Sequence, residues 1–255
     1  MLETSELTIR FGGHVAVDHV SAAFKPGTLT AIVGPNGAGK TTYFNLISGQ
    51  LKASAGTVTL NGRDLSGLPA SQRTRAGLGR AFQLTNLFPR LTVLENVRLA
   101  VQASREGTHR RGLNLWSIWS DHKALTARAD EILVDVAMAD KESELVANLP
   151  HGDQRKLEVA LLMALDSQVF MFDEPTAGMN AAEAPVILDL IRKLKDDPSK
   201  TILLVEHKMD VVRELADRII VLHNGSLVAD GEPAEVIASP IVQQAYLGTV
   251  AEAAT

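Results

Sequence analysis

The chain has 255 residues, 45% of them hydrophobic, and its 25 basic and 30 acidic side chains give a formal net charge of −5 at pH 7. This length and apolar content allow a sizeable buried core in one large or two small domains, and without a long run of one charge the chain gives no support for a nucleic-acid partner. No cysteine occurs, which excludes disulfides, thiolate zinc sites and cysteine nucleophiles and suits a reducing cytosol.

The amino-terminal segment "MLETSELTIRFGG" lacks the charged lead and apolar block of an export signal. No window of the sequence reaches the roughly 18 uninterrupted apolar residues of a membrane span. We therefore expect a globular chain that neither crosses a membrane nor is exported.

The first sixty residues predict short strands separated by glycine and proline turns, because apolar residues recur there in "LTIRF", "VAVDHVSAAF", "LTAIVG" and "TVTLNG". These segments predict a small antiparallel sheet together with a buried strand. The glycines between Gly34 and Gly39 interrupt the pattern before a helix. From Thr92 to about Asp140 the period is helical, with Thr92 as one plausible N-cap. Ser120 and Asp121 are the other candidates.

The second half predicts a parallel sheet closed by a hairpin. "VFMFDE" and "TILLVEH" are continuous apolar runs, which is typical of strands buried on both faces of such a sheet. "RIIVLHNGSLVADG" reads as a hairpin turned by Asn224 and Gly225. The predicted organisation is α/β with a helical insertion.

The strongest chemical signal is "GPNGAGKT", Gly34 to Thr41, which fits the phosphate-loop pattern G-x-x-x-x-G-K-[ST] between a strand and a helix. Glycines let the backbone approach phosphates, Lys40 reaches the β- and γ-phosphates, and Thr41 is a magnesium ligand. A mere glycine-rich turn is the alternative, and the flanking strand and helix disfavour it. The nucleotide-binding candidates of this loop are Gly34, Pro35, Asn36, Gly37, Ala38, Gly39, Lys40, Thr41 and Thr42.

Two neighbouring carboxylates, Asp173 and Glu174, end the apolar run "VFMF". Asp173 could hold the magnesium shell, and Glu174 could polarise the water that attacks the γ-phosphate. Alone, the pair could simply mark a strand that ends at solvent, but beside a phosphate loop the catalytic interpretation is favoured. Taken singly, His207 and Gln83 are unremarkable polar residues.

Together, in this order and spacing, these residues resemble the ATP-binding subunit of ABC transporters, and the resemblance covers almost the whole chain. It implies a P-loop (RecA-like) ABC nucleotide-binding domain with an N-terminal antiparallel β subdomain and a helical insertion, and it implies ATP and Mg²⁺ as ligands. A single domain would span 1–255, with the ATP-binding core at 1–85 and 166–255 and a helical signature subdomain at about 90–165.

The resemblance also implies roles for individual residues. Phe11 in "RFGG" would stack on adenine with Val17 lining the pocket, although Phe11 could also join the core. Gln83 would touch both the magnesium site, with Thr41 and Asp173, and a membrane permease. His207 would be the switch histidine, so that the catalytic residues are Glu174, His207, Lys40 and Gln83. The loop that contacts a second subunit, the dimer-contact loop, would comprise Ala177, Gly178, Met179 and Asn180.

Several fragments narrow the resemblance to ATPases of branched-chain (neutral, aliphatic) amino-acid importers: "RFGGHVAVDHVS", "RAFQLTNLFPRLTVLENV", "GDQRKLEVA", "AGMN" and "AYLG". ATPases for urea, amides and lipopolysaccharide export are related alternatives. A soluble ABC ATPase in translation or DNA repair, or a P-loop kinase or GTPase, fits the motifs less well. The implied partners are a second ABC ATPase subunit, permease subunits and, indirectly, a substrate-binding protein. The implied location is the cytoplasmic face of the cell membrane.

"LPHGDQ" stands where the family usually carries the signature L-S-G-G-Q, whose helix faces ATP bound by the other subunit. We define the signature loop as Pro150, His151, Gly152, Asp153 and Gln154. Pro150 has neither a hydroxyl nor an N–H to donate, and Asp153 is expected to act as the N-cap of the following helix. The missing donors lead us to expect a heterodimer with two unequal ATP sites.

Two tryptophans, Trp116 and Trp119, are spaced three apart, as on one face of a helix. Packing inside the helical insertion is the favoured interpretation, because aromatic pairs at this spacing usually lie in a core. A surface for the permease is the alternative.

Overall fold

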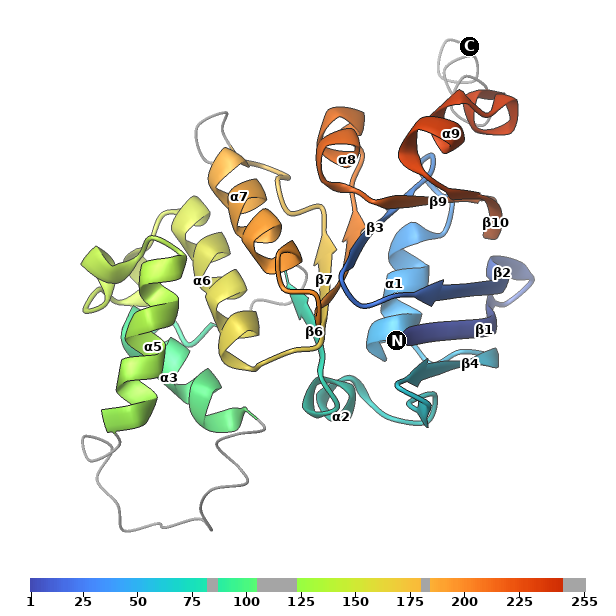
Figure 1. Cartoon of the computed structure of the whole chain (residues 1–255). Helices are drawn as coiled ribbons and strands as arrows, with labels where there is room; N and C mark the ends of the chain where they lie inside the picture. Colours follow the sequence, from blue (N-terminus) through green and yellow to red (C-terminus); the bar gives the residue numbers. More distant parts are fainter. Residues whose placement is uncertain (82–86, 105–122, 180–183, 245–255) are drawn as a thin grey trace.

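The computed structural model describes residues 1–81, 87–104, 123–179 and 184–244, which form two β-sheets and a lobe of helices (Figure 1). Among these residues no helix has the length and apolar character needed to cross a membrane. Some residues discussed above lie outside the described ranges: Gln83, Trp116, Trp119, Ser120, Asp121 and Asn180.

The smaller sheet is antiparallel and has the strand order β2-β1-β4-β5. Its strands are β1 (Leu2–Phe11), β2 (His14–Phe24), β4 (Ala55–Leu60) and β5 (Arg63–Asp64). Three of these strands follow the segments predicted from apolar alternation, so the predicted N-terminal antiparallel sheet is confirmed.

The larger sheet has the order β10-β9-β3-β8-β7-β6 and is parallel except for the β9–β10 hairpin. Its strands are β3 (Thr28–Val33), β6 (Leu78–Ala81), β7 (Val169–Asp173), β8 (Thr201–Val205), β9 (Arg218–His223) and β10 (Ser226–Gly231). Every residue of β7 and β8 is buried, as the continuous apolar runs predicted. The hairpin turns at Asn224 and Gly225, whose φ angles of 47° and 79° suit the predicted two-residue turn.

Helices cover both faces of this sheet (Figure 1). Helix α1 (Lys40–Ser48) lies between the two sheets, where Phe44 joins one core cluster with Met171 of β7. On the other face Phe170 of β7 joins a second cluster with Ile187 of α7 (Ala184–Lys195). Successive side chains of β7 therefore serve two cores, because strand side chains alternate between faces. Three short helices complete this part: α2 (Ala70–Arg75), α8 (Met209–Leu215) and α9 (Pro233–Ala238).

The helical lobe follows β6 and returns to the sheet at β7, as the predicted helical insertion requires. It contains α3 (Val93–Ala103), α5 (Lys123–Asp135), α6 (His151–Ala164) and two short 3₁₀ turns, η2 (Ala139–Lys141) and η3 (Val146–Asn148). Thr92 is the N-cap of α3, as predicted. Its hydroxyl accepts from Glu95 N at 3.2 Å while Thr92 N donates to Glu95 Oε2 at 2.8 Å, which is a reciprocal capping box.

Candidate nucleotide-binding site

The phosphate loop connects β3 to α1 and is possible only with glycine at its close contacts. A Cβ at Gly34, where φ is 151°, would lie 2.1 Å from Leu222 O, and a Cβ at Gly39, where φ is 96°, would lie 2.5 Å from Ala16 O. Gly39 is also the N-cap of α1 and offers no side chain to the first amides of that helix. The start of α1 therefore keeps unpaired N–H groups, which suit a phosphate anion.

Lys40 is held across the loop rather than extended into solvent. Its Nζ donates to Gly34 O at 2.7 Å and to Pro35 O at 2.8 Å, and the residue is 6% exposed. Burial lowers the pKa of Lys40, and the nearby carboxylates of Glu174 and Asp173 oppose that change. The ammonium group is thus already in place beside the amides at the start of α1.

A cavity of about 280 Å³ lies over the phosphate loop. It brings residues 36–42 of the loop together with Glu174 and His207, which arrive from the ends of β7 and β8. This convergence follows from the fold, because the carboxyl ends of β3, β7 and β8 share one edge of the parallel sheet. The remaining lining residues, His14 and Ala16, come from β2.

The two residues expected at adenine are placed differently from each other. Phe11 ends β1 with 49% of its surface exposed, so the alternative of a core position for Phe11 is wrong. Val17 is fully buried in the core, whereas its neighbour Ala16 lines the cavity. Side-chain alternation along β2 explains this difference, because adjacent residues of a strand face opposite sides. Of Ala16 and Val17, it is therefore Ala16 that lines the cavity.

Glu174 and His207 form a pair at the mouth of the cavity. A hydrogen bond of 2.6 Å joins His207 Nε2 to Glu174 Oε1, and about two fifths of each side chain is exposed. Glu174 has a φ of 50°, which is uncommon for a residue other than glycine. Its backbone N donates to Val205 O at 2.9 Å and holds that conformation. Backbone strain of this kind clusters at functional sites.

Asp173 is held by a partner that the sequence did not reveal. Arg80 Nη2, from β6, donates to Asp173 Oδ2 at 2.8 Å, and both side chains are 7% exposed. Burial raises the pKa of Asp173, although Arg80 opposes that rise. Burial likewise lowers the pKa of Arg80. The available signal was an arginine within the apolar segment "LGRAF", directly after Gly79, which is itself close-packed.

The oxygen atoms at this edge fit a magnesium ion. Thr41 is exposed at the first turn of α1, and the carboxylate of Asp173 ends the neighbouring strand β7. Mg²⁺ prefers hard oxygen ligands and is usually held by one or two protein groups together with substrate phosphates. The residues present therefore suit the ion that the sequence implied.

The signature loop does not line the cavity; it begins α6 in the helical lobe. The expectation that Asp153 is the N-cap of this helix is wrong, because the N-cap is Pro150, whose carbonyl accepts from Asp153 N and Gln154 N. Asp153 lies in the first turn, where its carboxylate pairs with Lys141 of η2 and with Lys156. His151 is exposed and Gly152 is buried.

The described part of the dimer-contact loop is a turn directly after Glu174. Ala177 N donates to Glu174 O at 3.0 Å, and Gly178 has a φ of 72°. Ala177 and Gly178 are exposed and Met179 is partly buried. These three residues also lie outside the cavity lining.

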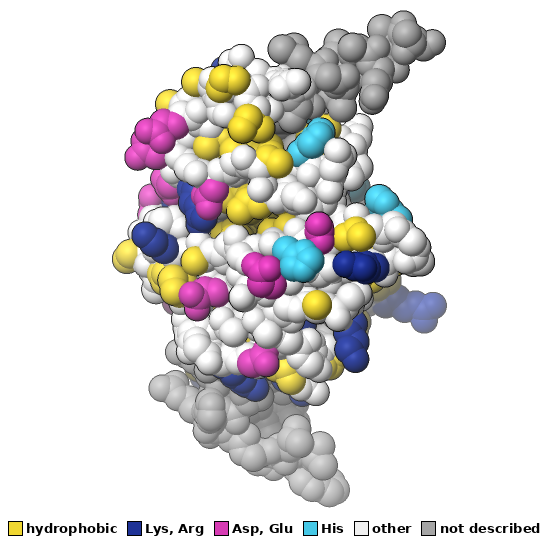
Figure 2. All heavy atoms as spheres, turned by 90° about the vertical axis from the view of Figure 1, so that its right-hand side faces the viewer, with side chains coloured by type: hydrophobic (Ala, Val, Ile, Leu, Met, Phe, Trp, Pro, Cys, Tyr) yellow, Lys and Arg dark blue, Asp and Glu magenta, His cyan; other side chains and the backbone are white. Residues whose placement is uncertain are grey.

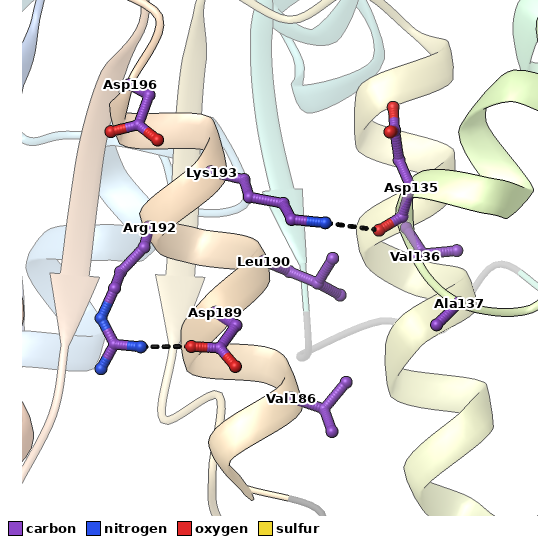
Figure 3. Close-up of a pocket in the computed structure, with 9 residues that line it drawn as sticks. All are labelled: Asp135, Val136, Ala137, Val186, Asp189, Leu190, Arg192, Lys193 and Asp196. Atoms are coloured by element: carbon purple, nitrogen blue, oxygen red, sulfur yellow. Dashed lines mark hydrogen bonds and ion pairs between the residues drawn. The ribbon is translucent and has the colours of Figure 1, made fainter.

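A larger cavity of about 410 Å³ lies between the end of α5 and helix α7, away from the phosphate loop (Figure 3). Its lining includes Asp135, Asp189 and Lys193, and contains none of the residues expected to bind nucleotide. Lys193 Nζ reaches across it to Asp135 O at 3.4 Å. This contact joins the helical lobe to the sheet's covering helix.

The face at the right of Figure 1 carries acidic, basic and histidine side chains scattered among one another over its described part (Figure 2). Apolar side chains gather toward the upper part of the same view.

Comparison with known proteins places these features in a family. Residues 17–177 match the profile of a family described as "ABC transporter", and residues 226–252 match one described as "Branched-chain amino acid ATP-binding cassette transporter". The high-affinity branched-chain amino acid transport ATP-binding protein LivG of Salmonella typhimurium is 38% identical over 249 residues, covering 97% of this chain and 98% of LivG. The high-affinity branched-chain amino acid transport ATP-binding protein BraF of Pseudomonas aeruginosa is 36% identical over 250 residues. The alignment covers 97% of this chain and 98% of BraF.

Solved structures of ATP-binding cassettes have the same fold as this chain. The ADP conformation of MJ1267, an ATP-binding cassette of an ABC transporter, has a TM-score of 0.80 at 27% identity and covers 97% of this chain and 98% of its own. The dimeric post-hydrolysis state of the cassette MJ0796, bound to ADP and Pi, has a TM-score of 0.75 at 26% identity, with 91% and 99% covered.

Proposed function

Since this chain belongs to the ABC transporter family and is an ATPase of that family, we propose that it energises the import of branched-chain or other neutral amino acids through a separate permease. The match of residues 226–252 to the branched-chain family and the names of LivG and BraF support this cargo. ATPases for urea, amides or lipopolysaccharide are the alternatives. One observation links the ATPase assignment to particular residues: the cavity that brings the phosphate loop together with Glu174 and His207.

The proposed chemistry uses charges that the fold has already placed. Lys40 and the amides at the start of α1 neutralise charge on the β- and γ-phosphates, and the phosphates would then compete with the two carbonyls that now hold Lys40. Glu174 accepts a proton from the attacking water, and His207, hydrogen-bonded to it, holds the γ-phosphate end. Mg²⁺ held by Thr41, Asp173 and Gln83 would supply further positive charge there.

At the other end of the nucleotide we propose that the exposed ring of Phe11 stacks on adenine. Its exposure supports this role, because a large aromatic side chain at a strand end is free to cover a ligand. Ala16 replaces Val17 in this proposal as the residue that lines the cavity.

A second ATPase subunit is part of the proposal. The signature loop and the described residues of the dimer-contact loop lie outside this chain's own cavity, which supports the proposal that they contact ATP bound by another subunit. The dimer of the cassette MJ0796 supports such an arrangement. We further propose permease subunits that contact Gln83, a substrate-binding protein acting indirectly, and a location at the cytoplasmic face of the cell membrane. The proposed division remains one domain, with its core at 1–85 and 166–255 and its helical subdomain at about 90–165.

The catalytic assignment is tested by Glu174→Gln in the assembled transporter. The amide cannot accept the proton, so we expect turnover to fall by about 10²–10⁴-fold while ATP binding persists and the closed dimer accumulates. ATPase rate, nucleotide titration and size-exclusion chromatography are the measurements. Glu235→Gln, an exposed glutamate on α9, is the matched control and should hydrolyse ATP as the wild type does. Rapid hydrolysis by Glu174→Gln would remove Glu174 from this role.

The cargo assignment is tested separately by uptake into vesicles that contain the assembled transporter. We expect ATP-dependent accumulation of leucine, isoleucine or valine. Accumulation of urea or a short amide in their place would contradict the cargo while leaving the ATPase assignment intact.

A further inference from the structure

A buried carboxylate, Glu206, lies directly before His207 and is 4% exposed. Its oxygens accept three hydrogen bonds. Oε1 accepts from Thr176 Oγ1 at 2.7 Å, and Oε2 accepts from His207 N at 2.7 Å and from Lys208 N at 3.2 Å. Sequence reasoning missed this residue, because a glutamate at a strand end is ordinarily solvated.

Thr176 connects this carboxylate to the other half of the site. It lies two residues after Glu174, immediately before the dimer-contact loop, and is 2% exposed. Its Oγ1 also accepts from Lys208 Nζ at 3.3 Å. Glu206, Thr176 and Lys208 therefore contact one another between the segment after β7 and the turn after β8, with Lys208 reaching Glu206 through its backbone N.

The position of this set determines its effect. Parallel pairing of β7 and β8 ends at Asp173 and Val205. Beyond it, the two segments are joined by the Glu174 N–Val205 O bond, by the Glu174–His207 pair and by the two contacts of Thr176, with Glu206 and with Lys208 Nζ. The Glu174–His207 pair is partly exposed, so the orientation of His207 toward Glu174 depends on the buried Glu206–Thr176 bond.

A purely structural role is the plainer alternative. A carboxylate that caps two turn amides satisfies them without affecting catalysis. However, taking a carboxylate out of water is costly, and a serine or an asparagine can cap a turn without that cost. Charge-assisted hydrogen bonds are shorter and stronger than neutral ones, so an ionic acceptor gives a stiffer joint.

We propose that Glu206 is a positioning residue that couples the dimer-contact loop to the switch histidine. Through Thr176 it fixes the His207 turn to the segment that leads into the loop, so that a displacement of the loop by a partner subunit moves His207 relative to Glu174. The inference rests on the proposed function, in which Glu174 and His207 act on ATP.

The first test compares Thr176→Val with Thr176→Ser. Valine keeps the shape of threonine but removes the hydroxyl, which leaves Glu206 Oε1 without its donor, whereas serine restores the hydroxyl. Small displacements of catalytic groups can cost about 10²-fold. We therefore expect kcat of the assembled transporter to fall about 10- to 100-fold for Thr176→Val and to stay within about twofold of wild type for Thr176→Ser.

Binding is measured beside turnover, because a positioning role changes kcat and leaves affinity alone. Titration with the fluorescent analogue mant-ATP should give wild-type affinity for both variants. Circular dichroism and thermal melting check that both variants are folded. Equal losses in kcat and in mant-ATP affinity, or a failure of serine to restore turnover, would reduce Glu206 to a structural residue.

A double variant tests whether the two residues act through the same contact. Glu206→Gln keeps the side chain's size but offers only one acceptor oxygen. If both single changes break one joint, the Glu206→Gln/Thr176→Val chain should have a kcat within about twofold of the slower single variant. Losses that multiply would mean independent effects and would contradict the coupling.

Glu174→Gln is run in parallel to separate the two proposals. If Glu174→Gln abolishes turnover while Thr176→Val hydrolyses ATP at the wild-type rate, the coupling role of Glu206 is wrong and the proposed function stands. If Glu174→Gln hydrolyses ATP rapidly, the proposed function itself fails.

Discussion

Single residues decide how the acidic end of the site is held. Arg80 Nη2 fixes one oxygen of Asp173, and Nη1 of the same guanidinium donates to Asn45 Oδ1 at 2.6 Å and to Ser48 Oγ at 2.9 Å. The guanidinium also lies over the ring of Phe44, 5.3 Å from its centroid. Arg80 therefore ties β6, β7 and the end of α1 together through one oxygen of Asp173.

The Arg80→Met variant should be much less stable than the wild type. Methionine retains most of the apolar stem but removes the charge, so the buried carboxylate of Asp173 loses the cation that is hydrogen-bonded to it. Breaking a buried ion pair in this way costs about 3–5 kcal/mol. Urea denaturation at pH 7 measures the free energy of unfolding. Arg75→Met, at an exposed position of α2, is the control and should change it by less than about 0.5 kcal/mol. Equal losses in the two variants would contradict a specific role for the Arg80–Asp173 pair.

At the scale of elements, the entrance of α6 depends on an ion cluster and not on a side-chain cap. Burial by itself raises the pKa of Asp153, but hydrogen bonds from Lys141 and Lys156, together with their charges, outweigh it and hold the pKa below its usual value. A lowered carboxylate pKa means that the ionised form stabilises the fold. That contribution is present above the pKa of the unfolded chain and is lost as the pH falls through the pKa of the folded state.

Asp153→Asn should reveal this contribution through its pH dependence. At pH 7 we expect the free energy of unfolding of the variant to be lower by about 1.5–3 kcal/mol, as for other hydrogen bonds to charged groups. The difference should shrink as the pH falls below about 3.9, the pKa of an unfolded aspartate. Urea denaturation across pH 2.5–7 measures it, with exposed Asp130→Asn of α5 as the control. A pH-independent difference would mean that the charge of Asp153 is not responsible.

Elements with a strong hydrophobic period were predictable, and contacts between distant elements were not. The apolar runs of β7 and β8 and the contiguous phosphate-loop motif carry their structure in neighbouring residues, so both the sheet and the loop followed from sequence. Asp153 was misassigned because a carboxylate near a helix start is compatible with the N-cap and with the first turn alike. Arg80 and Thr176, the side-chain partners of Asp173 and Glu206, lie 93 and 30 residues away in the sequence. Hydrophobic periodicity within one element contains no information about such distant contacts.

For the whole molecule, the placement of the signature loop in the helical lobe makes the choice of partner subunit matter. Pro150 has a φ of −55° and offers no side-chain cap, so it presents neither hydroxyl nor N–H to a phosphate. If the transporter is the heterodimer that Pro150 leads us to expect, the ATP site completed by this loop has fewer hydrogen-bond donors than the other site.

Pro150→Ser should raise ATPase turnover by up to about tenfold when this chain is paired with its natural partner, because a hydrogen bond to a charged group is regained. Pro150→Ala is the matched control, since it restores the N–H without the hydroxyl. Turnover and ATP affinity of the assembled transporter are the measurements. If both quantities are the same in the serine variant and the wild type, the expectation of unequal sites is wrong.

The insertion of the helical lobe between β6 and β7 also has a mechanical consequence. These strands pair in parallel from Leu78–Val169 to Ala81–Phe172, and β6 is the edge of the sheet. The lobe is therefore attached to the sheet through two strands. Strand β6 pairs with one neighbour in the described sheet, whereas β7 pairs with two. The inner strand, β7, ends at Asp173, directly before Glu174. Through β7 a movement of the lobe would reach the edge of the sheet where the cavity over the phosphate loop lies.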